Sequence, residues 1–326
     1  MLAMDLLLRS LGRLAAPAGA KARLTVVLYH RVLSSADELL PAEPDAALFD
    51  AQMGMLSRVF HILPLGEALA KVRQGTLPAR ALSITFDDGY RDNLEVAVPI
   101  LQRHGLVATF FVATGFLNGG RMMHDTVVET VRRLPAQQLD LDWIGLGQRR
   151  VDDTASRLAL IGDIVSRVKY LPFAQRRDTC ERFKSLSPTA LPTDLMMTSA
   201  QVQLLQRAGM HVGAHTHDHP ILAKSDRNEA WQQITRNREE LARLLGAAPR
   251  LFAYPNGKPG LDYGREHVEL VKKAGFEAAV SVAFGTVSSG SDHYQIPRFI
   301  PWDRDPMKLA LRILANSLRN RSASYA

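Results

Sequence analysis

Long apolar runs are missing from this 326-residue sequence, and cysteine occurs only once. No stretch reaches the roughly 20 consecutive apolar residues that a membrane-spanning helix requires. The single cysteine, Cys180, cannot form an internal disulfide, so nothing indicates an oxidising compartment. Together with the lack of an export signal, these absences predict a cytoplasmic location, with contact to the inner face of the membrane left open.

Runs of like charge are missing as well. The formal net charge is +7, but basic residues are interspersed with acidic ones. Such a balance favours anionic partners, which include nucleic acid, acidic lipid headgroups and acidic polysaccharides. The sequence contains no zinc-finger spacing and no aromatic RNA-binding motif, so we expect no nucleic-acid partner.

The first 22 residues predict an amphipathic segment. Asp5, Arg9 and Arg13 interrupt the apolar stretch that an export signal would need. The leucines recur at helical spacing: Leu7, Leu8, Leu11 and Leu14. Packing of this helix against its own domain is the favoured interpretation, and contact with an anionic membrane surface is the alternative.

Four segments share the pattern of a helix, a glycine and an apolar strand. Three of them end in a basic residue, one further residue and glycine, at QRHG (102–105), QRAG (206–209) and KKAG (272–275), and the fourth ends in LLG (244–246). Glycine suits the left-handed position that ends a helix, and a basic last turn suits the helix dipole. Repeated helix–turn–strand units predict a parallel α/β sheet or barrel.

The region from about 119 to 197 interrupts this repeat and predicts a mostly helical insertion. Thr198 is the expected N-cap of the next helix. We therefore expect three parts: the N-terminal segment 1–22, a barrel over 23–304, and a C-terminal helix and tail over 305–326.

Polar motifs follow several predicted strands, at LYHR (28–31), ITFDDGY (84–90), HTHDH (215–219) and FAYPNG (252–257). Sites in parallel α/β folds gather at this edge of the sheet. The adjacent carboxylates Asp87 and Asp88 repel each other, so they indicate either a solvated Asp-Gly turn or a nearby positive centre. Three alternating histidines after a strand favour a metal site, which would supply that positive charge.

The motifs TFDDG (85–89) and HTHDH together resemble the polysaccharide deacetylases of carbohydrate esterase family four, over residues 24–303. The resemblance implies an α/β fold, a distorted (β/α) barrel with the insertion between its two metal-binding motifs. It implies that Asp87 is the catalytic base. It also implies that Asp88, His215 and His219 bind one divalent metal ion, which we expect to be zinc from the ligand types. His217 is left as a substrate contact or a support for the ligands.

The sequence departs from the family pattern at two places. The arginine that would orient the base is absent before Tyr254, Pro255 and Asn256, which we expect to contact substrate together with Trp302. Arg298, on the last predicted strand, is the expected replacement. The usual histidine acid has no clean match, so we predict His30 in that role because it ends the first strand. His124 and His293 are expected to be exposed loop histidines.

The resemblance implies hydrolysis of the N-acetyl group of an N-acetylhexosamine in a bacterial polysaccharide or lipid-linked saccharide, as in exopolysaccharide assembly systems. Two alternatives stay open. One is a deformylase or another sugar amidohydrolase, and the other is an inactive metal-containing carbohydrate-binding protein. If Asp87 is the base, replacement by asparagine is expected to relieve repulsion from Asp88 and to raise stability slightly.

Overall fold

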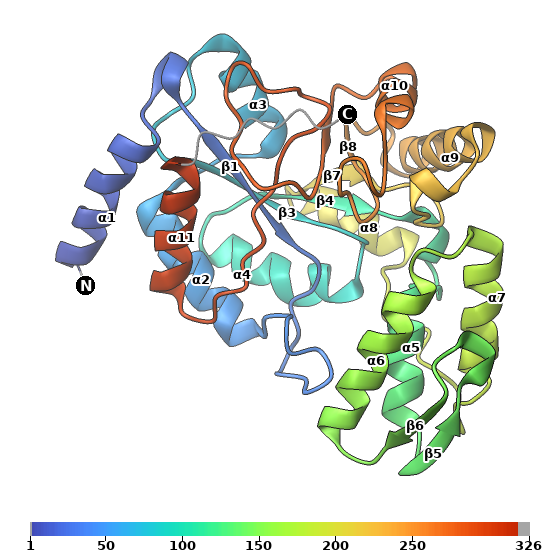
Figure 1. Ribbon diagram of the computed structural model, residues 1–326. Helices are drawn as coiled ribbons and strands as arrows, with labels where there is room; N and C mark the ends of the chain where they lie inside the picture. The colour runs from blue at the N-terminus through green and yellow to red at the C-terminus, as the bar shows by residue number, and fades with distance from the viewer. Residues whose placement is uncertain (1, 319–326) are drawn as a thin grey trace.

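A seven-stranded parallel sheet forms the centre of the computed structural model, which describes residues 2–318 (Figure 1). The strand order is β1-β3-β4-β7-β8-β9, and β2 pairs with the start of β3. The strands are β1 (Leu24–Tyr29), β2 (His61–Ile62), β3 (Ala81–Phe86), β4 (Ala108–Val112), β7 (His211–Ala214), β8 (Leu251–Ala253) and β9 (Ala278–Val280). Every residue of β1, β3 and β4 is buried, which agrees with their continuous apolar sequences.

The segment after β9 curls this sheet toward a barrel. Bridges pair Val280 with Ile296 and Val27 with Phe299, so residues 296–299 lie between β9 and β1. The sheet therefore closes through an irregular segment instead of a regular strand. The predicted α/β fold, a distorted barrel, is confirmed.

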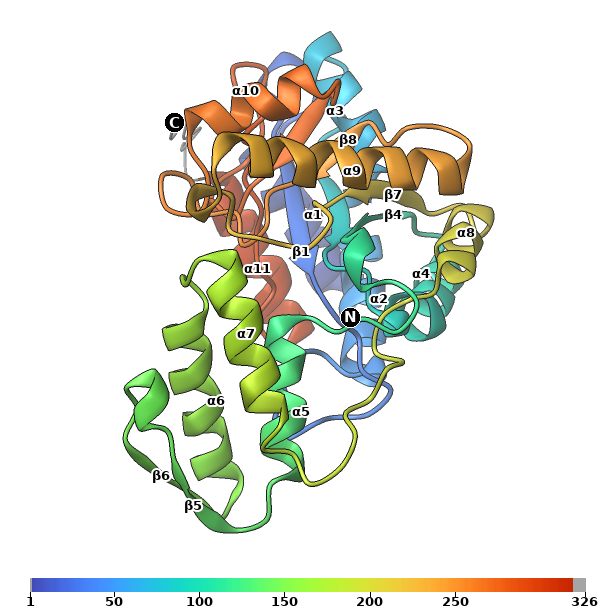
Figure 2. The same cartoon turned by 90° about the vertical axis from the view of Figure 1, so that its right-hand side faces the viewer.

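Helices cover the outside of the sheet (Figures 1 and 2). They are α1 (Leu2–Ala15), α2 (Ala46–Val59), α3 (Leu65–Gln74), α4 (Val98–Arg103), α8 (Ser199–Arg207), α9 (Arg227–Leu245), α10 (Arg265–Lys273) and α11 (Pro306–Leu318). The predicted helix–glycine–strand units are present, since Gly105, Gly209, Gly246 and Gly275 have φ of +64°, +81°, +77° and +85° ahead of β4, β7, β8 and β9. Thr198 caps α8, and the side chain of Gln201 bonds back to it as predicted for a helix start.

The insertion forms a lobe below the sheet in both views (Figures 1 and 2). It contains α5 (Met123–Arg133), α6 (Thr154–Val168) and α7 (Phe173–Lys184), and also an antiparallel hairpin of β5 (Gln137–Asp140) and β6 (Gln148–Val151) that the sequence did not predict. Its apolar cluster includes Val127, Leu160 and Phe183, together with Leu33 and Leu39 from the segment after β1. The lobe is therefore packed onto the barrel at the edge where β1 ends.

Helix α1 packs against α2 and α11 through one face only. Leu8, Gly12 and Ala15 are buried on that face, whereas Leu7, Leu11 and Leu14 are exposed. The leucines expected on one stripe are thus divided between two faces. Within the described part of the chain, no helix combines the length and the apolar character needed to cross a membrane.

Candidate active site

The parallel register brings two predicted site residues to the same level. Tyr29 and Phe86 are paired at the ends of β1 and β3, so His30 and Asp87 are the first residues beyond this pair. The backbone N–H of Asp87 donates to the carbonyl of Tyr29 at 3.0 Å. The carboxyl edge of the sheet therefore carries the site, as expected for parallel strands.

The turn after β3 is what allows adjacent carboxylates to face one cleft. Residues next to each other on a regular strand point to opposite sides. Here Asp88 adopts φ of +78° and Gly89 follows with φ of +91°. A Cβ at Gly89 would also lie 3.0 Å from a methyl carbon of Val112, so this position requires glycine. The strained conformation of Asp88 belongs to the site, where such strain tends to be retained.

Asp87 is held by Arg298. The two guanidinium nitrogens Nη1 and Nη2 donate to the two carboxylate oxygens at 2.7 Å each, and Nε of Arg298 donates to the carbonyl of Ser281 at 3.0 Å. Both side chains are buried. Burial alone would raise the pKa of Asp87, but Arg298, together with His215 and His30, outweighs it and the pKa lies below its usual value. Asp87 is therefore an ionised carboxylate with a fixed orientation.

Asp88, His215 and His219 converge on one point. The Oδ1 atom of Asp88 lies 3.4 Å from Nε2 of His215 and 3.5 Å from Nε2 of His219. The three ligand atoms all lie within 4.8 Å of one another. The Oδ1 atom is buried and has no hydrogen-bond partner in the described structure, which leaves it free for a cation.

This donor set fits a divalent metal ion. Ligand atoms at ~2.1 Å from a tetrahedral ion are separated by about 3.4 Å, which the two Asp88–histidine distances match. Two imidazoles and one carboxylate leave positions open, as in catalytic sites. The three ligands are consistent with the predicted single divalent ion, and its identity as zinc stays a prediction.

The two histidine ligands differ in their electrostatics. Burial lowers the pKa of His219 to about 3, so its imidazole is neutral and able to bind a cation. Burial also disfavours the charged form of His215, but Asp87 and Asp88 outweigh this effect and raise its pKa. The Nδ1 atom of His215 contacts the carbonyl of Ala253 at 2.8 Å, which directs Nε2 toward the aspartates.

A cavity of about 560 Å³ opens over this centre. Its lining includes Asp87, Asp88, His215, His219 and two further predicted residues, His30 and Asn256. The apolar part of the wall includes Met122, Phe173 and Ile300, so barrel and insertion both contribute. The cavity therefore lies between the predicted metal ligands and the insertion.

Three of the predicted substrate contacts lie elsewhere. Tyr254 is fully buried and stacks on Tyr263 with ring centroids 3.8 Å apart, and Pro255 is buried beside it. Trp302 is exposed and lies against Phe284 and not in the cavity lining. The structure therefore leaves Asn256 as the member of this predicted group that faces the cavity.

His217 supports the metal loop from behind. Its Nδ1 atom lies 3.0 Å from the Thr114 hydroxyl and 2.9 Å from a carboxylate oxygen of Glu240 on α9. It is absent from the ligand cluster and from the lining of the cavity. Of its two predicted roles, the contacts favour support of the ligands over substrate contact.

The expectation for His124 is right about its exposure but wrong about its place in a loop. It lies on α5, not in a loop, and it lines the cavity that also contains His30. His293 does lie in a loop, is half-buried, and does not line the cavity. The sequence could not place His124, because the direction in which α5 docks depends on the packing of the insertion.

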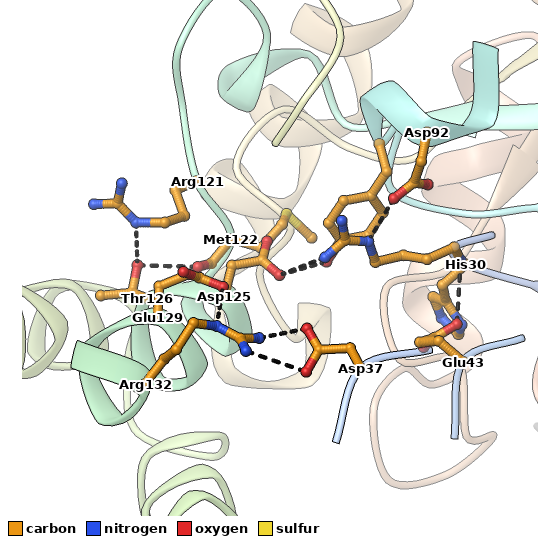
Figure 3. A network of polar contacts seen from close by, with 12 residues as sticks. His30, Asp37, Glu43, Asp92, Arg121, Met122, Asp125, Thr126, Glu129 and Arg132 are labelled. Carbon is orange, nitrogen blue, oxygen red and sulfur yellow. Dashed lines mark hydrogen bonds and ion pairs between the residues drawn. The ribbon is translucent and has the colours of Figure 1, made fainter. Parts of the chain in front are cut away.

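A buried ionic network that the sequence did not reveal joins the insertion to the barrel (Figure 3). Arg31, next to His30, donates to Asp92 at 2.8 Å and lies 4.0 Å from Asp125 on α5. The hydroxyl of Tyr90 donates to Asp125 at 3.2 Å. Burial raises the pKa of Asp92 to about 6 and that of Asp125 to about 7, with Arg31 opposing both shifts. These contacts hold Arg31 in place directly after β1, and they therefore also restrict the position of its neighbour His30.

Residues 74–139 and 175–279 match the sequence profile of the family described as Polysaccharide deacetylase. The two ranges cover more than half of the chain, and the gap between them lies in the insertion. A protein of Bacillus subtilis (strain 168) named "Putative polysaccharide deacetylase YxkH" is 33% identical over 93 residues, which are 28% of this chain and 32% of that protein. The match thus spans less than a third of that relative's length.

Solved structures share the fold. The Streptococcus pyogenes deacetylase PplD in complex with acetate has a TM-score of 0.60 at 17% identity, over 90% of this chain and 98% of that chain. IcaB from Ammonifex degensii has a TM-score of 0.56 at 19% identity, over 91% of this chain and 97% of that chain. At these identities the similarity concerns the distorted barrel.

Proposed function

The chain belongs to the polysaccharide deacetylase family, and on that basis we propose that it hydrolyses the N-acetyl group of an N-acetylhexosamine in a bacterial polysaccharide or lipid-linked saccharide. The enzyme class, a metal-dependent hydrolase, follows from the family and from the Asp–His–His cluster. The identity of the saccharide and the identity of the acyl group that is removed are what we propose.

The proposal rests on one observation, which is that the two adjacent aspartates make different contacts. Asp88 faces the two histidine ligands, whereas Asp87 is turned to Arg298. The Oδ2 atom of Asp87 still lies 3.8 Å from Nε2 of His215, so it remains beside the metal position. A carboxylate that is ionised, oriented and adjacent to a metal position is suited to accept a proton from water.

The chain's own residues can then perform both proton transfers. When bound by Asp88, His215 and His219, a divalent ion supplies Lewis acidity to the amide carbonyl and to water. Asp87 accepts the proton of the attacking water, and Arg298 positions its carboxylate throughout. His30 lies on the same edge of the sheet, and its positive form is among the groups that lower the pKa of Asp87 and Asp88. We assign His30 as the acid that protonates the leaving amine, because the register places it next to Asp87.

The test is release of the acyl group from a panel of N-acetylated and N-formylated oligosaccharides by metal-loaded protein. Acetate release that is abolished by a chelator supports the proposal, and preferential formate release would support the deformylase alternative. Asp87→Asn is expected to retain the metal and to lose roughly 100-fold or more in activity. Saccharide binding without hydrolysis by the wild type would instead favour the carbohydrate-binding protein.

The acid is tested separately, since His30 and His124 both line the cavity. His30→Gln is expected to lower kcat by about 100-fold and His124→Gln by much less. Activated acyl substrates, whose leaving groups need no proton, should restore the rate of the His30 variant. The reverse ranking of the two variants would move the assignment to His124.

We propose further that α1 docks onto an anionic membrane surface. Leu7, Leu11 and Leu14 are 51%, 46% and 81% exposed on one face, and Arg9 and Arg13 form no ion pair with any acid in residues 2–318. A helix with exposed leucines on one face and cations on another fits an apolar surface rimmed by acidic lipid headgroups. Leu11→Glu should weaken binding to vesicles containing phosphatidylglycerol, whereas Leu204→Glu, at a position 45% exposed on α8, should not. Equal loss, or no binding by the wild type, would refute this docking, and the cytoplasmic location stays a prediction.

A further inference from the structure

Four cations that line the active-site cavity form no ion pair with any acidic group in residues 2–318. Arg121, Lys169 and Arg176 come from the insertion, and Lys258 follows β8. Two other cations of the same cavity are neutralised, since Arg31 pairs with Asp92 and Arg177 with Asp178. The first four therefore present positive charge that no direct ion pair neutralises to whatever fills the cavity.

The two arginines are held in place by neutral oxygens. Arg121 donates to the carbonyl of Pro192 at 2.7 Å and to the hydroxyl of Thr126 at 3.2 Å. Arg176 is only 7% exposed and donates to the carbonyl of His219 at 3.0 Å. These bonds orient the guanidinium groups without cancelling their charge, so each guanidinium keeps unused N–H donors.

The two lysines line the same cavity. Burial lowers the pKa of Lys169, Asp262 opposes this shift, and Lys258 adds to it. Burial lowers the pKa of Arg121 and Arg176 in the same way. Holding like charges at one cavity wall is unfavourable unless a bound anion compensates them.

The acidic side chains of the cavity act on these cations only from a distance, as Glu181 does on Arg121 and Asp218 on Arg176, and each makes its direct contacts elsewhere. Asp87 pairs with Arg298, Asp88 faces the histidine ligands, Glu181 pairs with Lys184, Asp218 accepts from Gln233, and Glu43 accepts from the backbone of Arg31. A ligand in the cavity is therefore the group that can pair with these cations directly.

We infer that the saccharide substrate carries a phosphate or diphosphate group, and that Arg121, Lys169, Arg176 and Lys258 bind it while the acylated sugar occupies the metal centre. Four cations exceed what a single carboxylate can neutralise, whereas a phosphate or diphosphate offers several oxygens and more than one charge. Three of the four cations belong to the insertion, which therefore selects the substrate. The inference rests on the proposed function, because it specifies the substrate of the same site.

The experiment compares three substrates of the metal-loaded enzyme: an N-acetylhexosamine, its 1-phosphate, and the same sugar linked through diphosphate to a polyprenyl chain in detergent. We expect kcat/KM for both phosphorylated forms to exceed that of the neutral sugar by about 30-fold or more, from two or more charge-assisted contacts. Equal preference for the soluble and lipid-linked forms identifies phosphate itself as the recognised group, and preference for the polyprenyl form alone identifies the lipid-linked source.

The variants test which residues produce this preference. Lys169→Met and Lys258→Met should each lower the ratio of phosphorylated to neutral kcat/KM by about tenfold. Lys272→Met is the matched control, since this lysine lies on α10, is exposed, is paired with Glu269 and does not line the cavity. A ratio near one in the wild type, or a ratio that the double lysine variant leaves unchanged, overturns the inference.

A binding measurement separates failure of the inference from failure of the proposed function. Metal-free wild type should bind inorganic diphosphate in calorimetry, and the double lysine variant should not. If no acylated saccharide is hydrolysed, the proposed function fails, and this titration still decides the phosphate site. If neutral oligosaccharides are hydrolysed equally well and diphosphate does not bind, the phosphate site is refuted and the proposed function stands.

Discussion

Replacement of Arg298 by methionine removes the cation that holds the proposed base. The guanidinium is fully buried and makes both of its 2.7 Å bonds to Asp87. Removing one partner of a buried pair leaves an uncompensated charge and typically costs about 3–5 kcal/mol. We therefore expect Arg298→Met to lower the free energy of unfolding by about that amount and to lower turnover by roughly 10- to 1000-fold.

The same contacts reverse the expected effect of Asp87→Asn on stability. The sequence suggested relief of repulsion between Asp87 and Asp88, but the structure shows that asparagine would leave Arg298 buried without a carboxylate. Each single variant should thus be destabilised, whereas the double variant Asp87→Asn/Arg298→Met leaves neither charge alone. Its stability should return to within about 1–2 kcal/mol of the wild type, which gives a favourable coupling energy between the two sites.

The assay is chemical denaturation of the four proteins in the presence of a chelator, together with kcat and KM of the metal-loaded forms. Arg298→Lys is the conservative control, since it retains the charge but not the two parallel bonds, and should recover part of kcat. Additive destabilisation in the double variant would refute the buried pair as described. Wild-type kcat in Arg298→Met would refute the positioning of Asp87 by Arg298.

Two further predictions concern the metal centre and the insertion. His215→Ala and His219→Ala should each lose the divalent ion, as measured by elemental analysis. His217→Ala should retain most of the ion, because the ring of His217 contacts Glu240 and Thr114 and not the metal position. Equal loss of metal in all three variants would overturn the ligand assignment. The pKa of Asp125 is about 7 in the fold and near 4 when unfolded, so between about pH 4 and 7 the folded chain binds more protons and the free energy of unfolding falls as pH rises. Asp125→Asn should flatten this slope in denaturation curves and raise stability at pH 8 by about 1–3 kcal/mol, and an unchanged slope would show that Asp125 is not the titrating group.

The sequence predicted those features that a short segment encodes. Each helix–glycine–strand unit needs only a left-handed glycine and an apolar strand, and Gly105 before β4 is an example. The ligand cluster was predictable because Asp88, His215 and His219 follow strand ends, and parallel strands align those ends. The position of Arg298 could be proposed for the same reason, since residues 296–299 continue the sheet.

Features that depend on distant packing were not predictable. Tyr254 belongs to a strand-end motif, but its stacking on Tyr263 turns it away from the cavity. His124 faces the cavity only because Leu33 and Leu39 pack against the insertion and fix the direction of α5. The left-handed backbone of Asp88 was only hinted at by the Asp-Gly pair, because few non-glycine residues adopt that conformation even though aspartate is among the more frequent ones.

Closure of the sheet by the segment that carries Arg298 links completion of the active site to the order in which the chain is made. Asp87 and Arg298 are separated by 211 positions, so β3 leaves the ribosome well before its partner, by on the order of 10–40 s at ~5–20 residues per second. During that interval the free edge of β1 has no neighbour and Asp87 has no cation, so burying this carboxylate is unfavourable. Residues 296–299 therefore complete the sheet and supply the cation of Asp87 at the same time. A nascent chain that ends before residue 298 has neither the closed sheet nor the buried ion pair.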